Sequence, residues 1–141
     1  MEPNCIFCKI VNKEIPSSKV YEDKHHLAFL DIAPVNKGHT LLIPKQHYED
    51  LFDMPEDMLA LTGSILKKLS AAVMKGVKAD GVNVGVNNKS AAGQIVFHAH
   101  FHIIPRFNQD GLKAWPHKKY ENVDEMGTYK DKIQMQLLKP S

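Results

Sequence analysis

The chain has 141 residues, 43% of them hydrophobic and 24% charged, which predicts one ordinary folded domain and excludes a disordered chain. Eighteen Lys and Arg residues against sixteen Asp and Glu residues leave a formal charge of +2, and the basic residues are scattered. We therefore expect no nucleic-acid partner, because tracking a phosphate backbone requires a concentrated basic face. No apolar run approaches the roughly 20 residues that span a bilayer, so we expect a cytoplasmic protein without membrane association.

The first third of the chain predicts strands. Apolar and β-branched runs separated by turn residues lie at 19–22, 26–31 and 39–44. The short connections between them suit antiparallel pairing.

The middle of the chain predicts one long helix. Apolar residues recur there at steps of three and four, which gives an apolar stripe. Its members are Met58, Leu61, Ile65, Leu69 and Val73. Asp53 and Glu56 have the spacing of a capping box, and Asp80–Gly81 is the expected stop.

The last part of the chain completes a mixed pattern. Two further strands are expected at 82–87 and 95–104, and a weaker helix at 124–138. Strands, a helix and more strands predict an α+β domain built on an antiparallel sheet. No repeat, low-complexity tract or Ser/Gly-rich linker marks a boundary, so we expect a single domain over residues 1–141.

Histidine is the unusual residue of this chain, with eight copies. His98, His100 and His102 alternate along the expected strand 95–104, so their side chains would share one face while the intervening apolar residues enter the core. Imidazole can be a nucleophile, a general acid and a hydrogen-bond donor near neutral pH, so this face suits phosphate or metal chemistry. Three others are expected at the surface: His25, His26 and His117.

The run from Gly93 to Ile104 resembles the signature of the histidine-triad (HIT) nucleotide-binding proteins. The similarity extends upstream, in the family's order, to residues 5–10, 28–34 and 38–45. The resemblance covers about 5–106 and leaves about 107–141 as a C-terminal extension. It implies the HIT fold, a five-stranded antiparallel sheet with one long helix and a C-terminal helical segment. It also implies a homodimer, in which the middle helix and the last part of each sheet join across a two-fold axis. The C-terminal segment around Trp115 would reach the partner's site.

The resemblance implies hydrolysis or transfer at the α-phosphate of a purine nucleotide through a covalent nucleotidyl-histidine intermediate. His100 would be the nucleophile, while His102 and His39 would contact phosphate oxygens or pass a proton to the leaving group. Nucleoside phosphoramidates and adenylylated compounds are the expected substrates, with dinucleoside polyphosphates second. Ile95 stands where some family members carry Ser or Thr, which removes one possible hydrogen bond. No paired carboxylates or Walker-type loop suggest a need for Mg²⁺.

The same resemblance implies the nucleotide contacts. Asp31 matches the carboxylate on the ribose hydroxyls, and Asn87 and Gln94 match amide donors to the phosphate. The apolar positions that sandwich the base correspond to Ile6, Phe7, Ile10, Phe29 and Ile32.

The two cysteines, Cys5 and Cys8, are too few for a disulfide scaffold but have the spacing of a metal knuckle. Bacterial-type HIT proteins supply two more ligands at the positions of His47 and His98, so the resemblance implies a structural zinc site that removes His98 from catalysis. The alternative is a pair of reduced cysteines packed as small hydrophobes. A thioredoxin-like redox pair is disfavoured, because no helix-opening βαβ context surrounds the motif.

Two rival functions stay open. Three alternating histidines could hold a catalytic zinc with an open water position, which would make the protein a metallohydrolase. The same fold could also serve as a non-catalytic nucleotide sensor or partner-binding module, because a fold alone does not guarantee chemistry.

Overall fold

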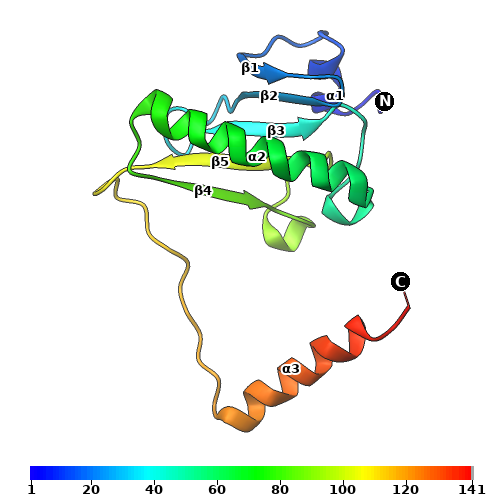
Figure 1. The fold of residues 1–141 in the computed structure, drawn as a ribbon, viewed down its shortest axis with the longest axis vertical. Helices are drawn as coiled ribbons and strands as arrows, with labels where there is room; N and C mark the ends of the chain where they lie inside the picture. The colour runs from blue at the N-terminus through cyan, green and yellow to red at the C-terminus, as the bar shows by residue number, and fades with distance from the viewer. Residues whose placement is uncertain (141) are drawn as a thin grey trace. The chain divides into compact units, whose positions relative to one another are not determined.

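Five antiparallel strands form one sheet in the order β1-β2-β3-β5-β4 (Figure 1). In this computed structural model, which describes residues 1–140, the sheet and its flanking helices confirm the expected α+β architecture. The strand bounds are β1 Lys19–Glu22, β2 His26–Leu30, β3 Thr40–Pro44, β4 Gly81–Val86 and β5 Phe101–Arg106. The expected strand at 19–22 is confirmed to the residue, and the next two differ by one residue at one end.

The long helix α2 (Glu56–Val77) covers one face of the sheet (Figure 1). Its buried side chains pack on the strands in one hydrophobic cluster. That cluster includes Ala28, Leu42, Leu69, Val73, Phe101 and Ile103. The helix stripe was expected from the sequence, although Leu61 is exposed.

The expected capping box is wrong. Pro55 is the N-cap of α2 and makes no side-chain cap hydrogen bond. Asp53 instead accepts from the backbone N–H of Glu49 at 2.9 Å, because a short 3₁₀ helix (η1, Leu51–Asp53) precedes α2. At the other end the helix stops at Val77, and Lys78 in the left-handed conformation forms the C-cap before Asp80–Gly81 is reached.

His26 is fully buried, so its expected surface position is wrong. Its Nε2 lies 2.7 Å from Oγ1 of Thr62, and that hydroxyl donates to the carbonyl of Met58 at 2.8 Å. Because the hydroxyl proton is used, Nε2 of His26 must be the donor. This pair joins β2 to α2 inside the core, while His25 and His117 are exposed as expected.

The other face of the sheet carries a helix that the sequence analysis missed, α1 (Ile6–Val11). Its Phe7 packs with alternate residues of β2 and β3 in a second hydrophobic cluster. That cluster contains Phe7, Leu27, Phe29, Leu41 and Ile43. Cys5 is the N-cap of α1, and its sulfur accepts from the N–H of Cys8 at 3.3 Å.

The expected strand at 95–104 is wrong in its first half. Sheet pairing begins at Phe101, opposite Leu42 of β3 and Val86 of β4. Before it, the N–H of Ala99 donates to the carbonyl of Tyr48 at 2.7 Å, which draws this segment away from the ladder. Alternation of buried and half-buried residues therefore holds only along β5, and His98 and His100 lie upstream of it, both buried.

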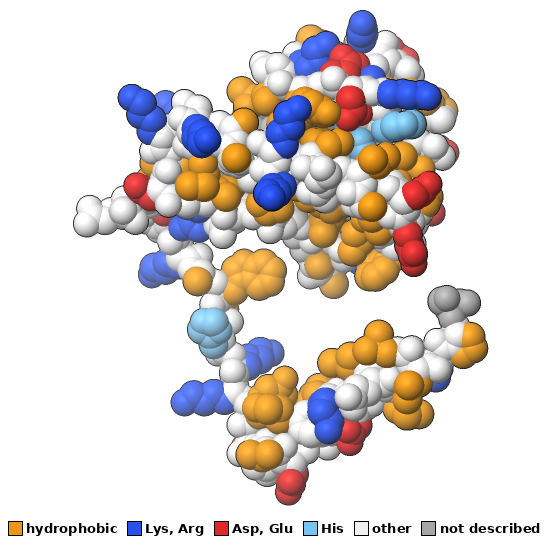
Figure 2. Space-filling view, in the orientation of Figure 1, with side chains coloured by type: hydrophobic (Ala, Val, Ile, Leu, Met, Phe, Trp, Pro, Cys, Tyr) orange, Lys and Arg blue, Asp and Glu red, His pale blue; other side chains and the backbone are white. Residues whose placement is uncertain are grey.

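The described residues from Gly111 onward form a second compact unit. Its helix α3 (Val123–Leu137) begins at Asn122, whose side chain accepts from the N–H of Glu125 at 2.8 Å. Figure 2 shows hydrophobic side chains along α3, and this helix has no buried residue. No helix within residues 1–140 has the length and apolar character needed to cross a membrane.

Candidate functional site

His100 presents one ring nitrogen as a lone-pair donor. Its Nδ1 lies 2.7 Å from the carbonyl oxygen of His98, and a carbonyl can only accept, so Nδ1 carries the proton. Nε2 of the same ring is therefore left unprotonated. The ring is only 8% exposed and meets the edge of the Phe7 ring at a centroid distance of 5.1 Å. The backbone thus fixes both the tautomer and the orientation of this imidazole.

His39 and His102 form a directed hydrogen-bond chain beside it. The N–H of Val35 donates to Nδ1 of His39 at 3.1 Å, so His39 must carry its proton on Nε2. That Nε2–H donates to Nδ1 of His102 at 2.9 Å. His102 is left with a proton on Nε2, and its ring centroid lies 5.1 Å from that of His100. The site therefore combines one imidazole lone pair with one imidazole N–H donor.

All three rings are neutral at pH 7. Burial lowers the pKa of His100 and His39 below the usual value near 6.5, and it lowers the pKa of His102 to about 4. The neighbouring imidazoles add to the shift at His102, because a second positive charge in the cluster is unfavourable. A neutral His100 keeps the lone pair that a nucleophile requires.

Asp31 follows β2 and completes this side of the site. Its Oδ1 accepts from the N–H of Ala33 at 2.9 Å, and its Oδ2 lies 3.8 Å from Nε2 of His39. Asp31, His39 and His102 are close enough to hold a metal ion. His39 is however tied at both nitrogens, so it has no free lone pair for a metal while Val35 donates to it. The arrangement of Asp31, His39 and His102 therefore fits a hydrogen-bond network better than a catalytic zinc site.

Gly38 sets the position of His39. It has a φ of +101°, and a Cβ there would lie 3.0 Å from Cγ1 of Val77 on α2. Only glycine adopts this conformation without strain while also approaching the helix so closely. The turn before β3 therefore delivers His39 to the site.

The loop between β4 and β5 holds the two predicted amide residues in different ways. Gln94 is buried: its Oε1 accepts from the N–H of Lys89, and its Nε2 donates to the carbonyls of Glu49 and Val96. Its amide is fully engaged with the backbone, so it holds the loop in shape here. The half-buried side chain of Asn87 has no hydrogen-bond partner within residues 1–140 and is free to donate.

The predicted base-binding residues divide into core and surface. Phe7 and Phe29 are buried with ring centroids 5.5 Å apart, and half-buried Ile10 packs on the same cluster. Ile6 is 45% exposed and Ile32 is 99% exposed. The structure brings the first three together, while the two isoleucines offer exposed apolar surface.

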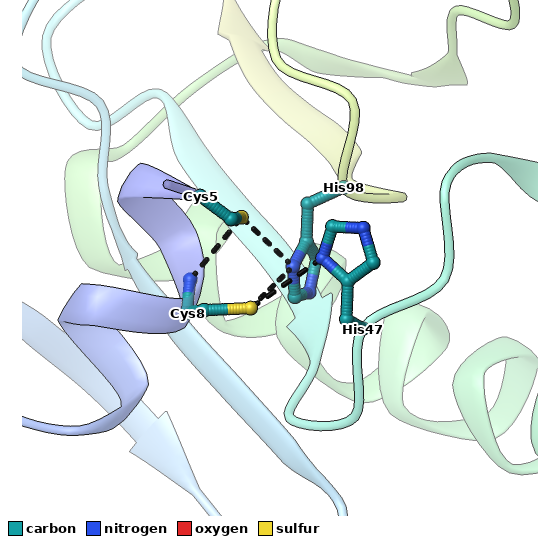
Figure 3. Close-up of side chains that lie close together, drawn as sticks. All are labelled: Cys5, Cys8, His47 and His98. Atoms are coloured by element: carbon teal, nitrogen blue, oxygen red, sulfur yellow. Dashed lines mark hydrogen bonds between the residues drawn. The ribbon is translucent and has the colours of Figure 1, made fainter. Parts of the chain in front are cut away.

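The two cysteines and two histidines that were predicted as metal ligands converge on one point (Figure 3). Their ligand atoms all lie within 4.8 Å of one another. The sulfur of Cys5 lies 3.4 Å from Nδ1 of His98, and the sulfur of Cys8 lies 3.4 Å from Nδ1 of His47. Helix α1, the loop after β3 and the segment before β5 each contribute to this Cys/His cluster.

The chemistry of this cluster fits a metal ion. Nε2 of His98 donates to the carbonyl of Pro44 at 2.8 Å, so the lone pair of this ring lies on Nδ1 and faces both sulfurs. A ligating histidine anchored through its other nitrogen is the usual arrangement in metal sites. Burial lowers the pKa of His98 to about 4 and raises that of the Cys8 thiol. Two sulfurs and two imidazole nitrogens are the ligands of tetrahedral zinc.

Some of the residues that organise the site were not predicted. Val35, Pro44 and Tyr48 act through backbone groups, which side-chain identity does not reveal. The contact between Phe7 and His100 depends on α1, which was not predicted. The apolar residues at 6–7 and 10–11, spaced one helical turn apart, are the sequence pattern that could have indicated this helix.

The fold and the site define a small α+β domain that carries a cluster of neutral histidines beside the inner strands β3 and β5 of an antiparallel sheet. A family model described as the HIT domain matches residues 12–109, and the chain belongs to this family. The adenosine 5′-monophosphoramidase of Saccharomyces cerevisiae is 41% identical over 129 residues, covering 90% of this chain and 78% of its own length.

Two solved structures resemble this chain over nearly its whole length. Protein SMU.412c of Streptococcus mutans UA159 is 42% identical with a TM-score of 0.91, covering 97% of this chain and 87% of that one. A zinc-bound histidine triad family protein of Mycobacterium smegmatis is 38% identical with a TM-score of 0.74, covering 95% of each chain.

Proposed function

We propose that this protein is a nucleotidyl hydrolase or transferase that cleaves at the α-phosphate of purine nucleoside phosphoramidates and related adenylylated compounds. The observation that carries the proposal is the pairing of an unprotonated Nε2 on His100 with an Nε2–H on the adjacent His102. A lone pair can attack phosphorus, while an N–H donor can stabilise the charge on the phosphoryl oxygens.

In the first step Nε2 of His100 attacks the α-phosphorus, and a P–N bond forms as the bond to the leaving group breaks. The leaving amine takes up a proton from solvent. The His100 ring keeps its proton on Nδ1 and becomes a cation, which the carbonyl of His98 stabilises by accepting a charged hydrogen bond. This carbonyl therefore supports the covalent intermediate as well as the tautomer.

In the second step water attacks the same phosphorus and gives up a proton to solvent, and the bond to Nε2 of His100 breaks so that the ring becomes neutral again. His102 acts in both steps as a donor to phosphoryl oxygens. Transfer of its Nε2 proton is disfavoured, because the chain of donors ends at the backbone N–H of Val35, which supplies no replacement proton. His39 is a positioning residue that fixes the tautomer of His102.

The remaining predicted residues are assigned to contacts with the ribose, the phosphate and the base of the nucleotide. We assign the ribose hydroxyls to the carboxylate of Asp31, which accepts from the N–H of Ala33, and the phosphate oxygens to the free amide of Asn87. Exposed Ile6 and Ile32 suit the two faces of a base, since stacking on apolar surface tolerates any purine. We assign Gln94 to shaping the loop, because its donors are engaged.

The phosphoramidate class is favoured by the name of the yeast relative, an adenosine 5′-monophosphoramidase. Ile95 is 87% exposed and supplies no hydroxyl to a leaving group. Dinucleoside polyphosphates are the second substrate class. A non-catalytic nucleotide sensor is the alternative function, and it requires binding without turnover.

Zn²⁺ is the proposed occupant of the Cys/His cluster, held by Cys5, Cys8, His47 and His98. When bound, the metal supplies a cross-link between three segments of the chain. The proposed assembly is a homodimer joined through α2 and the last part of the sheet, where Leu61, Val77 and Val84 are exposed.

The test is capture of the covalent intermediate. The protein is mixed with an adenosine phosphoramidate, quenched in denaturant and digested, and a nucleotidyl group on His100 is sought by mass spectrometry. His25→Ala, at an exposed histidine outside the site, is the matched control and should form the adduct. An adduct that persists in His100→Ala, or none despite turnover in the native protein, would contradict the mechanism. Binding of AMP without any turnover would support the sensor.

A further inference from the structure

Cys5 and Cys8 are the only cysteines of the chain, and both are free thiols. Their sulfurs lie within 4.8 Å of each other in the Cys/His cluster. A disulfide bond is about 2.05 Å long, so the two sulfurs must approach each other through side-chain rotation and a shift of the first turn of α1 before they can bond. A disulfide would leave neither sulfur as a thiolate, the form in which cysteine ligates a metal.

The cluster lies beside solvent on two sides. Cys5 and His47 line a surface hollow of about 580 Å³, and Cys8 lines a second hollow of about 290 Å³. Cys8 itself is only 1% exposed, whereas Cys5 is half-buried. A small oxidant can therefore reach the pair through Cys5 first.

Two contacts connect the cysteine pair to the nucleophile. Phe7, which lies between the cysteines in sequence, has its ring 5.1 Å from that of His100 and 5.9 Å from that of His98. His98, a member of the cluster, also accepts the Nδ1–H of His100 on its carbonyl oxygen. A change in the cluster thus acts on His100 through a side-chain contact and through the backbone.

We propose that Cys5 and Cys8 are a redox-sensitive pair whose oxidation to a disulfide by a peroxide opens the metal site and displaces His100. The two cysteines, which must be thiolates to hold a metal, give up two electrons as the S–S bond forms, and the O–O bond of hydrogen peroxide breaks with uptake of two protons from solvent to give two water molecules. His47 and His98 then remain as the only ligands from the cluster, too few to retain zinc.

The consequence for nucleotides rests on the proposed function. Displacement of Phe7 and His100 disturbs the base-binding cluster and the nucleophile together, so oxidation should weaken AMP binding by about tenfold, which corresponds to the net contribution of roughly one hydrogen bond. A thiol reductant together with zinc should restore it. The cysteine pair then makes nucleotide processing dependent on the redox state of the surroundings.

The experiment compares the zinc-loaded native protein before and after hydrogen peroxide, and again after dithiothreitol with added Zn²⁺. Four quantities are measured: the intact mass, the zinc released to a colorimetric chelator, the imidazole ¹⁵N signals, and the dissociation constant for AMP by calorimetry. We expect loss of two hydrogens, release of zinc, and a change in the signals of His100. The signals of buried His26, bonded to Thr62, should stay in place as an internal reference for an intact fold.

Cys5→Ser is the variant that cannot form the disulfide. In this protein peroxide should produce neither the loss of two hydrogens nor the change at His100 that accompanies it. A sulfenic acid on Cys8 or a sulfoxide on methionine would instead add an oxygen to the intact mass. If Cys5→Ser does not fold, the reversibility of the native protein still decides the question.

Failure of the reduced protein to bind zinc would overturn the proposal, as would a disulfide that releases zinc while His100 and the AMP affinity stay unchanged. Absence of phosphoramidate hydrolysis would instead contradict the proposed function. The mass, zinc and His100 measurements do not depend on turnover, so the two failures are distinguishable.

Discussion

His98 and His100 are two residues apart and both buried, yet the ring nitrogen that keeps a free lone pair is Nδ1 in His98 and Nε2 in His100. His98 donates from Nε2 to the carbonyl of Pro44 and turns Nδ1 toward two sulfurs. His100 donates from Nδ1 to the carbonyl of His98 and leaves Nε2 free. The difference shows that the backbone carbonyl met by each ring decides which nitrogen is available. One imidazole is thereby suited to a metal and the other to phosphorus.

Removal of the free Nε2 should have the largest effect on this comparison. His100→Ala should lower kcat on the order of 10⁶-fold, as loss of the nucleophile does in a covalent serine hydrolase, while zinc content stays unchanged. Steady-state hydrolysis of an adenosine phosphoramidate and metal analysis check both statements. Loss of zinc in this variant would mean that the two histidines are not separable.

Removal of the metal from the Cys/His cluster, which contains His98, should lower the stability of the fold. If zinc is present at about 1,000 times its dissociation constant, stripping it with a chelator should cost about 4 kcal/mol of stability. The midpoint of thermal unfolding should then fall by roughly 10 °C or more, and added Zn²⁺ should restore it. Calorimetry with and without chelator measures the change. An unchanged midpoint would argue for two reduced cysteines that pack as hydrophobes.

Lowering the pH should reduce the stability of the protein, because His102 takes up a proton less readily in the folded chain than in the unfolded chain. Burial holds the pKa of His102 at about 4, whereas an unfolded histidine titrates near 6.5. The unfolded chain therefore binds more protons between pH 6.5 and 4, so stability should fall as the pH is lowered through this window. Hydrolysis should fall by up to tenfold per pH unit below about 4, since protonated His102 can no longer accept from His39. Unfolding curves and rates across this range test it, and a loss of activity centred at pH 6.5 would contradict it.

The smallest effect is expected at a third buried histidine with no role in either cluster. Thr62→Val leaves Nε2–H of His26 without its acceptor, which should cost about 1–3 kcal/mol. Chemical denaturation measures this loss, and kcat should be unchanged. A drop in kcat would show that the contact between β2 and α2 reaches the nucleotide site.

The sequence could predict the elements and site residues that follow a regular spacing or a family motif. The period of the apolar residues predicted α2, and the family motif indicated both the four cluster ligands and His100. The errors arose where backbone partners prevailed over local pattern. Strict alternation predicted a strand from residue 95, but the hydrogen bond from Ala99 to Tyr48 delays β5 until Phe101. His26 looked like a surface residue because its acceptor, Thr62, lies 36 residues away.

The sequence by itself determined the class of fold, the family, and the set of imidazoles and thiols available for chemistry. Only the tertiary structure decided which nitrogen each imidazole presents. That choice depends on carbonyl and N–H groups of Val35, Pro44 and His98, which every residue type carries alike and only the folded chain brings into place.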